Sequence, residues 1–433
     1  MSVEVREPSA KYLIQAQFKD TEIGPIPSDW EIKRLRDISP NQSVGLVINP
    51  STYFDLRGTV PMLVGSNVTE NRIDWEGARR IARDSNERLP ASRVYTDDLV
   101  TVRVGDPGVT AVVSKEYSGS NCASMMIVRS HPSFDSNWLC YLMNSSYGRS
   151  RIESVQYGTA QKQFNISDAV EFKYPVPPLL EQRAIATALT EVDALIAGLE
   201  KLIAKKRNIK QAAMQQLITG QTRLPGFSGE WHQGVFGDVV TALEAGVSVN
   251  SIDTEPTIDT PCVLKTSALV GGRFLPNEAK VIEPRDIGRA RTSAKGDTIL
   301  ISRMNTPMLV GEVAYVARDF DSLYLPDRVW MARFNASKNV NVRWMAFLLS
   351  SQRYRDLLRD VATGTSGSMK NISKGALRSL PIQFPSPKEQ TAIATVLSYM
   401  DADLAALESQ LTKTRDLKQG MMQELLIGRT RLV

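Results

Sequence analysis

The side chains best suited to chemistry in this sequence are basic residues that gather in two short segments. The members are Arg79, Arg80 and Arg83 in the first segment, and Arg285, Arg289, Arg291 and Lys295 in the second. An arginine fork matches both phosphate oxygens and the O6/N7 edge of guanine, so each cluster could position DNA and read its bases. Acidic residues are interleaved in both segments, and a solvated, salt-bridged surface is the alternative interpretation.

A second candidate set lies in two loops that begin with glycine, GTAQKQFNIS from Gly158 and GTSGSMKNIS from Gly364. Small residues allow the backbone to approach a phosphate, and Gln or Asn can pair bidentately with adenine. The candidates in these loops are Gln161, Lys162, Lys370 and Asn371. A plain structural turn before the following strand is equally compatible with both loops.

Two further arginines occupy matching places at the ends of expected strands. Arg103 follows LVTV, and Arg303 follows TILIS. A side chain at such a strand end could enter a groove of DNA. The alternative interpretation is a buried ion pair.

Patterns for catalysis or metal binding are weak. The sequence has no GxxxxGK[ST] phosphate loop and no [DNS]PP[YFW] tetrad of the kind that DNA amino-methyltransferases carry; the nearest string, at Asn49, lacks the second proline and the aromatic residue. Glu-x-Lys triplets, as in restriction-type nucleases, occur at Glu31, Glu171 and Glu278, which is as often as chance allows. The three cysteines and two histidines are too few and too scattered for a zinc site. We therefore expect a non-catalytic chain without metal, whose cysteines are small buried hydrophobes.

Composition adds broad limits. The 433 residues are 42% apolar and 23% charged, which indicates a folded protein. The net charge of +5 is mildly basic and is by itself weak evidence for an acidic partner. No window has the 18 or so consecutive apolar residues of a membrane helix, and the N-terminal residues do not resemble a signal peptide. We expect a cytoplasmic protein with no membrane partner.

An internal repeat must organise the elements that position these side chains. Residues 181–224 align without a gap onto residues 389–432, with a constant offset of 208 and 23 identities in 44 positions. Apolar residues alternate at spacings of four and three in both copies, which predicts two long helices paired along a coiled-coil seam. The seam residues are Ile185, Leu189, Val192, Ile196, Leu199 and Ile203, matched by Ile393, Leu397, Met400, Leu404, Leu407 and Leu411. A pair of ordinary amphipathic helices in a shared core is the alternative.

The seam is interrupted by polar residues, and each helix has a defined end. The seam weakens at Lys206 and Lys210, matched by Thr414 and Lys418. The apolar pattern is then expected to resume at Ile209, Ala213 and Leu217, and in the second copy at Leu417, Met421 and Leu425. Gly220 and Gly428 suit left-handed caps that end the helices. At about 1.5 Å per residue, each rod would be roughly 55 Å long.

The segments between the helices predict two mixed domains. Short runs rich in Val, Ile and Tyr, such as LVTVRV, ASMMIVR, DTILISR and RVWMARF, are typical of strands. One short amphipathic helix is expected around Trp138 and another around Trp344. The prediction is an α+β fold in which two globular domains alternate with two long helices. Its boundaries are 1–178 for an N-terminal arm and first domain, 179–222 for the first helix, 223–386 for the second domain and 387–433 for the second helix.

This organisation carries a family resemblance that covers nearly the whole chain. The supporting segments are FKDTEIGPIPSDWEIKRL at residues 18–35, PPLLEQRAIA at 177–186 and QLITGQTRL at 216–224. With the two unlike domains and two near-identical helices, they resemble the specificity subunit of type I restriction-modification systems.

The resemblance implies a function that spacing alone does not give. In that family each variable domain is a target-recognition domain for one half of a split, asymmetric sequence in double-stranded DNA, and the helices pair antiparallel as a spacer. The helices also dock two modification subunits, which methylate adenine at N6 with S-adenosylmethionine. Restriction subunits add ATP- and Mg²⁺-dependent translocation and cleavage. The resemblance thus implies a chain that holds no cofactor itself.

Two other functions remain open on the residues alone. One is a coiled-coil scaffold with two protein-binding domains, which would lack the steep salt dependence of DNA binding. The other is a fused endonuclease, which would cleave DNA by itself in the presence of a divalent metal.

Overall fold

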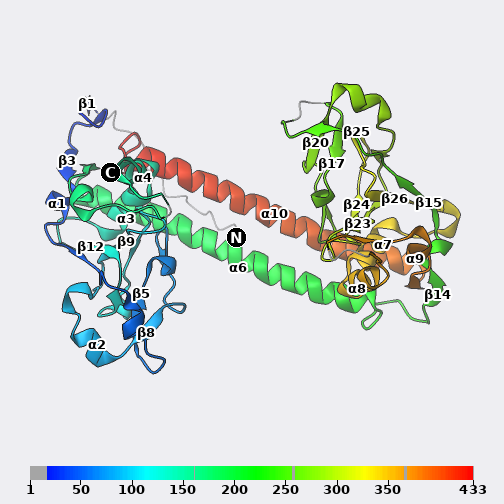
Figure 1. Ribbon diagram of the computed structural model, residues 1–433, viewed down its shortest axis with the longest axis horizontal. Helices are drawn as coiled ribbons and strands as arrows, with labels where there is room; N and C mark the ends of the chain where they lie inside the picture. Colours follow the sequence, from blue (N-terminus) through cyan, green and yellow to red (C-terminus); the bar gives the residue numbers. More distant parts are fainter. Residues whose placement is uncertain (1–16, 160, 256–258, 365–367, 433) are drawn as a thin grey trace, which may run out of the picture. The chain divides into compact units, whose positions relative to one another are not determined.

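The computed structural model describes residues 17–159, 161–255, 259–364 and 368–432. The first sixteen residues of the expected N-terminal arm lie outside this part. The chain divides into two compact units, which we call the first unit (residues 1–200 and 409–433) and the second unit (residues 201–408). The long helices α6 (Leu179–Ile218) and α10 (Pro387–Leu425) each contribute one part to the first unit and one part to the second (Figure 1).

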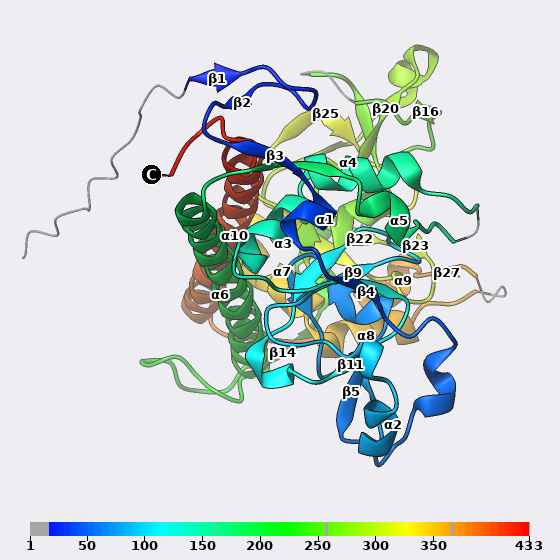
Figure 2. The same cartoon turned by 90° about the vertical axis from the view of Figure 1, so that its left-hand side faces the viewer.

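The first unit is built around a four-stranded antiparallel sheet, of which β4 and β9 are labelled in Figure 2. Its order is β10 (Thr110–Val112), β9 (Leu99–Val102), β12 (Met125–Val128) and β4 (Gln42–Val44). A smaller mixed sheet has the order β11 (Asn121–Cys122), β5 (Val60–Leu63) and β8 (Arg79–Ile81). The strands β3 (Glu31–Arg34) and β13 (Lys173–Val176) form a separate antiparallel pair. Alternating apolar residues fill the space between the main sheet and α3 (Ser136–Asn144), whose Trp138 is fully buried.

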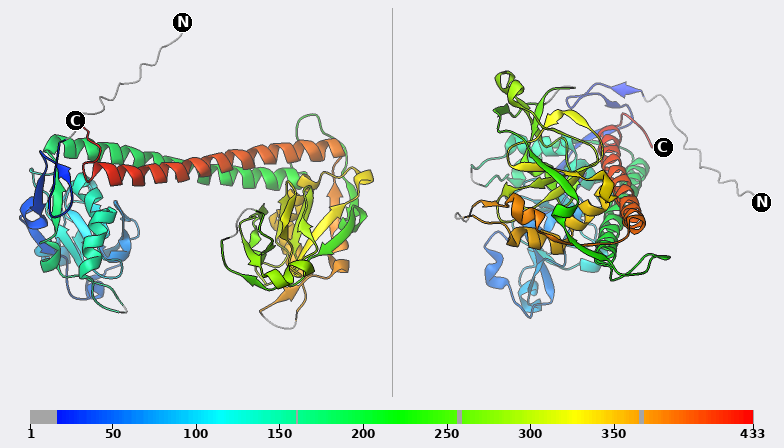
Figure 3. Two further views of the ribbon diagram at one scale, coloured as in Figure 1. Left: turned by 90° about the horizontal axis from the view of Figure 1, so that it is seen from above. Right: turned by 90° about the vertical axis from the view of Figure 1, so that its right-hand side faces the viewer.

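The second unit repeats this plan with longer strands (Figure 3, right). Its antiparallel sheet has the order β24 (Val313–Val316), β22 (Thr298–Ser302), β26 (Val329–Phe334) and β15 (Val240–Ala245). The mixed sheet has the order β16 (Ser251–Ile252), β20 (Ala279–Ile282), β17 (Cys262–Leu264), β25 (Phe320–Tyr324) and β21 (Ser293–Ala294). The pair β14 (His232–Val235) and β28 (Pro381–Phe384) corresponds to β3 and β13. The unlike domains therefore share the topology of the main sheet, while the mixed sheet of the second unit has two additional strands. The α+β prediction is confirmed.

The short helix expected in each domain is two helices. A serine separates α3 from α4 (Ser146–Val155), and another separates α7 (Val342–Ser350) from α8 (Gln352–Asp360). Ser145 has an extended backbone, and its hydroxyl accepts a hydrogen bond from the Gly148 N–H, as an N-cap does. The amphipathic period runs on across the break, so the sequence pattern alone did not reveal it.

Within each unit the two long helices run antiparallel, as their ion pairs show. In the first unit Lys418 binds Asp193 at 2.6 Å and Arg415 binds Glu200 at 2.6 Å. In the second unit Lys210 binds Asp401, and Arg207 binds Glu408 at 2.6 Å. Each residue of one pair lies 208 positions from its counterpart in the other unit, so the repeat is a repeat of contacts as well as of sequence.

The apolar seam is only partly a helix-to-helix contact. Among its members, Ile185, Leu189, Leu199, Ile203, Ile393, Leu397 and Leu404 are buried, and Val192, Ile196, Met400, Leu407 and Leu411 are half-buried. Ile185 and Leu189 join the core of the first domain, and Ile393 and Leu397 join that of the second. The N-terminal part of each helix therefore packs as an ordinary amphipathic helix in a core that it shares with a domain. This part of the seam agrees with the alternative to a coiled coil.

The expected resumption of the apolar pattern is confirmed at Leu217 and Leu425, which are buried, and is wrong at Ile209 and Leu417. The latter two side chains are 47% and 59% exposed, while Lys210 and Lys418 turn inward to bind aspartates on the opposite helix. Gly220 and Gly428, at φ +71° and +77°, follow the helices in the left-handed conformation that glycine favours. No helix in the described ranges is both long and apolar enough to cross a membrane.

Candidate nucleic-acid interface

In the first unit the fold joins the strand-end arginine to the glycine loop. Arg103 follows β9 directly, and its Nε donates to the carbonyl oxygen of Phe164 at 3.4 Å. The Gly105 N–H donates to the carbonyl oxygen of Lys162 at 3.1 Å, and Val104 forms an antiparallel bridge with Gln163. Because Phe164 is fully buried, it anchors a loop whose residues Gln161 and Lys162 are exposed.

In the second unit the corresponding residues form the same arrangement. Arg303 follows β22, and its carbonyl oxygen accepts from the Ile372 N–H at 2.9 Å. The strands β23 (Met304–Asn305) and β27 (Lys370–Asn371) pair antiparallel, which places Lys370 opposite Asn305. Ile372 is fully buried and anchors this loop as Phe164 anchors the other. In both units, therefore, the strand-end arginine lies beside the glycine-loop candidates, although the two are about 60 residues apart in the sequence.

Neither strand-end arginine is in a buried ion pair with a carboxylate of the described chain. Arg303 donates through Nε to the carbonyl oxygen of Asp327 at 2.8 Å and lies over the Trp330 ring at 5.6 Å. Arg103 makes the single backbone contact given above. Each guanidinium is half-buried and retains free N–H donors. Asn371 adds an unusual feature, because its side-chain carbonyl oxygen is buried and accepts no hydrogen bond. A ligand donor would satisfy it.

The basic cluster of the first unit lies on the mixed sheet and is free of acidic partners. Arg79 and Arg80 are exposed on β8, and Arg83 is exposed at the start of α2 (Arg83–Glu87). The Arg79 guanidinium lies 4.9 Å from the centre of the Phe54 ring, and Arg80 donates to the carbonyl oxygen of Thr59 at 2.9 Å. No ion pair forms between these three arginines and the described carboxylates, so their charge is available to an anion.

The cluster of the second unit is largely neutralised. Arg285 binds Glu283 at 2.8 Å and Arg289 binds Asp286 at 3.3 Å. Lys295 binds Asp321 and also lies 3.7 Å from Asp319; the hydrogen bond that Lys295 donates to the Asp321 carboxylate raises the pKa of Lys295 above its usual range. Arg291 is exposed and has no ion-pair partner among the residues that the structure describes. The salt-bridged surface is thus the better description of this cluster, Arg291 excepted.

The structure also presents surface residues that the sequence motifs did not select. Leu56 is fully exposed at the corner of a tight turn, in which the Gly58 N–H donates to the Asp55 carbonyl oxygen at 2.9 Å. The Arg57 N–H donates to the Asp55 carboxylate at 2.8 Å, which fixes the turn. The Asp-x-x-Gly pattern signals such a turn in the sequence, but the exposure of its leucine depends on the fold.

The described residues contain no cluster of three or more His, Cys, Asp or Glu side chains that could hold a metal ion. The cysteines are buried thiols, and burial raises the pKa of Cys122 to about 12, which makes its reactive thiolate rare. The prediction that these residues are small buried hydrophobes is confirmed.

Comparison with known proteins shows which family the sequence matches. A family model described as "Type I restriction modification DNA specificity domain" matches residues 27–210 and 289–414. The chain is 21% identical over 434 residues to the type I restriction enzyme EcoKI specificity subunit of Escherichia coli K12, covering 94% of this chain and 90% of that protein. It is 22% identical, with the same coverage, to the StySPI specificity subunit of Salmonella potsdam.

The fold is also found among solved structures. The crystal structure of the S subunit of a type I restriction-modification system from M. genitalium covers 92% of this chain and 96% of its own, with a TM-score of 0.58 and 15% identity. A structure from a study of complex assembly and conformational transition of the type I system covers 93% of this chain and 99% of its own, with a TM-score of 0.52 and 16% identity.

Proposed function

Because the chain belongs to the specificity subunits of type I restriction-modification systems, which are not the catalytic subunits, we propose that it reads a bipartite, asymmetric DNA sequence for its complex. Each unit reads one half-site in double-stranded DNA. The antiparallel helices set the distance between the half-sites.

The observation that carries this proposal is the duplicated junction of strand end and loop. In both units a half-buried arginine follows a central strand, and a loop anchored by a buried apolar residue lies beside it. The scaffold is the same, but the side chains differ: Gln161 and Lys162 in the first unit, Lys370 and Asn371 in the second. Arginine suits guanine, while Gln and Asn suit adenine. A common scaffold with different side chains is what two different half-sites require.

The basic residues outside these junctions would position the DNA backbone. Arg79, Arg80 and Arg83 have no acidic partners in the described chain and can contact phosphates. In the second cluster only Arg291 is equally available, because the ion pairs of Arg285, Arg289 and Lys295 must loosen first. We therefore assign the larger share of this backbone contact to the first cluster.

The repeated helix surfaces support docking of two modification subunits. Identical residues occupy equivalent exposed positions on both helices: Thr187 and Thr395, Ala194 and Ala402, Lys205 and Lys413. Identity at exposed positions is not needed for a core, so it favours one partner surface presented twice. On this proposal the modification subunits hold S-adenosylmethionine, the restriction subunits use ATP and Mg²⁺, and the complex works in the cytoplasm.

A salt titration of DNA binding tests the proposal. The full chain, assembled with its modification subunits, is expected to bind duplex DNA tightly at low salt and to lose affinity steeply between about 50 and 200 mM salt, because several phosphate contacts release counterions. Absence of binding at low salt would refute the DNA-reading function. If the chain bound partner proteins but no DNA, the scaffold function would replace it. Divalent-dependent cleavage by the chain alone would favour an endonuclease.

A further inference from the structure

A large groove in the second unit contains none of the candidate base-reading residues. It has a volume of about 1200 Å³ and lies between the helix parts of this unit and the turn that joins β18 (Leu269–Val270) to β19 (Arg273–Phe274). The helices contribute Arg207 and Lys210 from α6, with Asp401 and Glu408 from α10. The domain contributes four arginines that are widely spaced in the sequence. They are Arg273, Arg318, Arg343 and Arg355.

The carboxylates in the groove do not balance its cations. Asp401 is shared by Lys210 and Arg343, the latter at 2.9 Å. Glu408 is shared by Arg207 at 2.6 Å and Arg273 at 3.0 Å. Arg355 lies 3.4 Å from the buried carboxylate of Glu312, which does not itself line the groove. Six cationic side chains therefore share three carboxylates, and Arg318 has no ion pair with a described carboxylate. Such an excess is unfavourable in a partly buried place unless an anion offsets it.

Aromatic rings lie against two of these guanidinium groups. Arg343 lies over the rings of Phe347 at 4.5 Å and Tyr315 at 4.8 Å, and Arg318 lies over the Phe320 ring at 4.9 Å. Burial lowers the pKa of Arg343 from its usual range although Asp401 opposes the change. Stacked, planar guanidinium groups lose little freedom when they bind, and they match phosphate oxygens better than lysine does.

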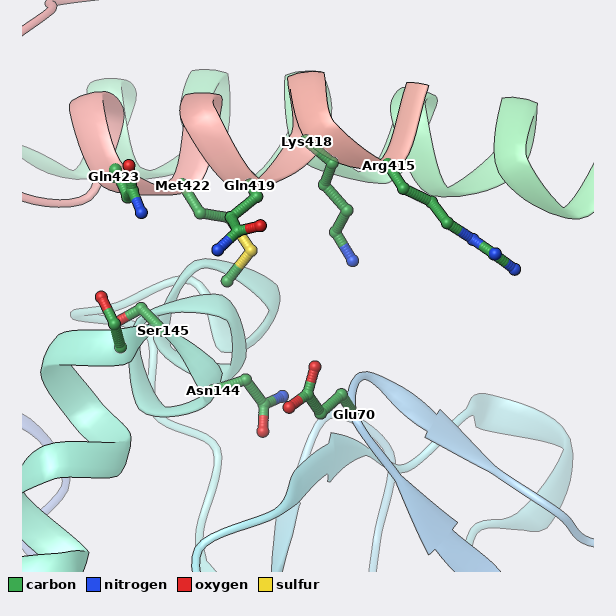
Figure 4. Close-up of a pocket in the computed structure, with 9 residues that line it drawn as sticks. Glu70, Asn144, Ser145, Arg415, Lys418, Gln419, Met422 and Gln423 are labelled. Atoms are coloured by element: carbon green, nitrogen blue, oxygen red, sulfur yellow. The ribbon is translucent and has the colours of Figure 1, made fainter. Parts of the chain in front are cut away.

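The first unit has the same framework without the excess charge. Its pocket, of about 310 Å³, is lined by Arg415, Lys418, Gln419 and Met422, which lie 208 positions from Arg207, Lys210, Gln211 and Met214 of the groove. Figure 4 shows the Lys418 and Met422 side chains extending from α10 towards Asn144 and Glu70. An acidic residue, Glu70, thus stands on the turn where the second unit has Gly271, and Arg72, the counterpart of Arg273, does not line the pocket. The positive charge is therefore a property of the second domain and not of the repeated helices.

We propose that this groove of the second unit binds the phosphodiester backbone of DNA at a place separate from the base-reading junction. The inference rests on the proposed DNA-reading function and adds a contact that is independent of sequence. Two features favour phosphate over the carboxylates of an acidic protein segment: five of the six cations are arginines, and three aromatic rings orient two of them. Because only the second unit has this groove, the complex would contact the DNA backbone differently at its two half-sites.

Substitutions of two exposed arginines test the proposal. Arg273→Gln and Arg318→Gln remove charge from the groove, and neither residue belongs to an apolar core, so the thermal unfolding of the chain should not change. Arg72→Gln is the matched control, because Arg72 is exposed on β7 (Arg72–Ile73), the strand of the first unit that corresponds to β19. Binding of the target duplex by the assembled complex would be followed by fluorescence anisotropy over a range of salt concentrations.

Each groove variant is expected to reduce the slope of log K against log salt by about 0.9, with the same fractional loss of affinity on target and non-target duplexes. The control should keep the wild-type slope. Methylphosphonate linkages placed one at a time along the duplex should then identify a phosphate whose neutralisation makes Arg318→Gln silent. Wild-type slopes in both groove variants, with target binding intact, would overturn the groove but not the DNA-reading function. Weaker assembly with partner subunits at an unchanged slope would also overturn it, in favour of an acidic protein segment.

Discussion

The two units differ in the charges that their domains present, although the links between their helices are the same. Lys418–Asp193 and Arg415–Glu200 in the first unit are repeated as Lys210–Asp401 and Arg207–Glu408 in the second. The basic cluster of the first domain is free, while that of the second is largely paired and its excess positive charge lies in the groove. The helix contacts therefore serve a requirement that both halves share, and the domain surfaces serve one that each half has alone.

A second repeated contact ties the end of each helix segment to the beginning of the other helix. Arg431 binds Glu181 at 2.6 Å and lies over the Trp30 ring at 5.7 Å. Arg223 binds Glu389 and lies over the Trp231 ring at 5.6 Å. The two glutamate side chains are each 2% exposed, so their charges depend on these arginines. The two contacts differ in their further bonds. Trp30 donates from Nε1 to Glu181 at 3.0 Å, while the Nε1 of Trp231 is buried without an acceptor. Arg431 also binds Asp29 at 2.7 Å, whereas Arg223 donates to the carbonyl oxygen of Gly229 at 2.8 Å.

The largest expected effect is a loss of stability when the ion pair between Arg431 and Glu181 is removed. Arg431→Ala leaves the buried Glu181 carboxylate without its cation and is expected to lower the free energy of unfolding by about 3–5 kcal/mol. Urea unfolding of the full chain measures it. Arg429→Ala is the control in the same tail, because the Arg429–Glu424 pair is exposed and should contribute about 0–1 kcal/mol. Equal losses in the two variants would show that the buried pair is not a distinctive stabilising contact.

A smaller loss of stability is expected when either lysine that links the two long helices, Lys418 or Lys210, is substituted. Lys418→Met should cost about 1.5–3 kcal/mol, because Asp193 keeps only the hydrogen bond from the Tyr141 hydroxyl. Lys210→Met should cost less, because Asp401 keeps its ion pair with Arg343. The same unfolding measurement compares them. A larger loss for Lys210→Met would contradict the role given to Arg343.

The smallest expected effect is on base discrimination, and it should fall on a different half-site for each unit. Arg103→Ala should reduce discrimination by about 1–3 kcal/mol at one half-site and leave the other unchanged, and Arg303→Ala should do the reverse. Binding selection from duplexes randomised in both half-sites gives the two preferences at once. Loss of discrimination at both half-sites in either variant would break the assignment of one junction to one half-site.

Much of the fold could be predicted because it is repeated in the sequence. The 208-residue offset, the apolar spacing and the two glycines predicted the helices, and the Val- and Ile-rich runs predicted the strands of both main sheets except β4 and β15. Ile209 and Leu417 were predicted wrongly because local spacing does not say which side of a helix its partner covers. Lys210 and Lys418 occupy the inward position, because each forms an ion pair with an aspartate on the facing helix.

The candidate site was predictable in parts but not as a whole. Arg103 and the loop at Lys162 were each visible in the sequence, but their contact depends on the burial of Phe164 beside β9. The groove left no sequence signal, because Arg273 and Arg343 come from separate elements and meet only in the folded domain. The ion pairs that neutralise Lys295 come likewise from a distant strand region, at Asp319 and Asp321.

An exchange of one domain tests the central claim most directly. Residues 36–172 of the first domain, which exclude the long helices and the segment around Trp30, would be replaced by the matching residues of another specificity subunit, and methylated adenines would then be mapped in cells that carry the assembled complex. One half-site is expected to change, while the other half-site and the gap between them stay as in the parent. A change in both half-sites, or in neither, would contradict the claim that each unit reads its own half of the target.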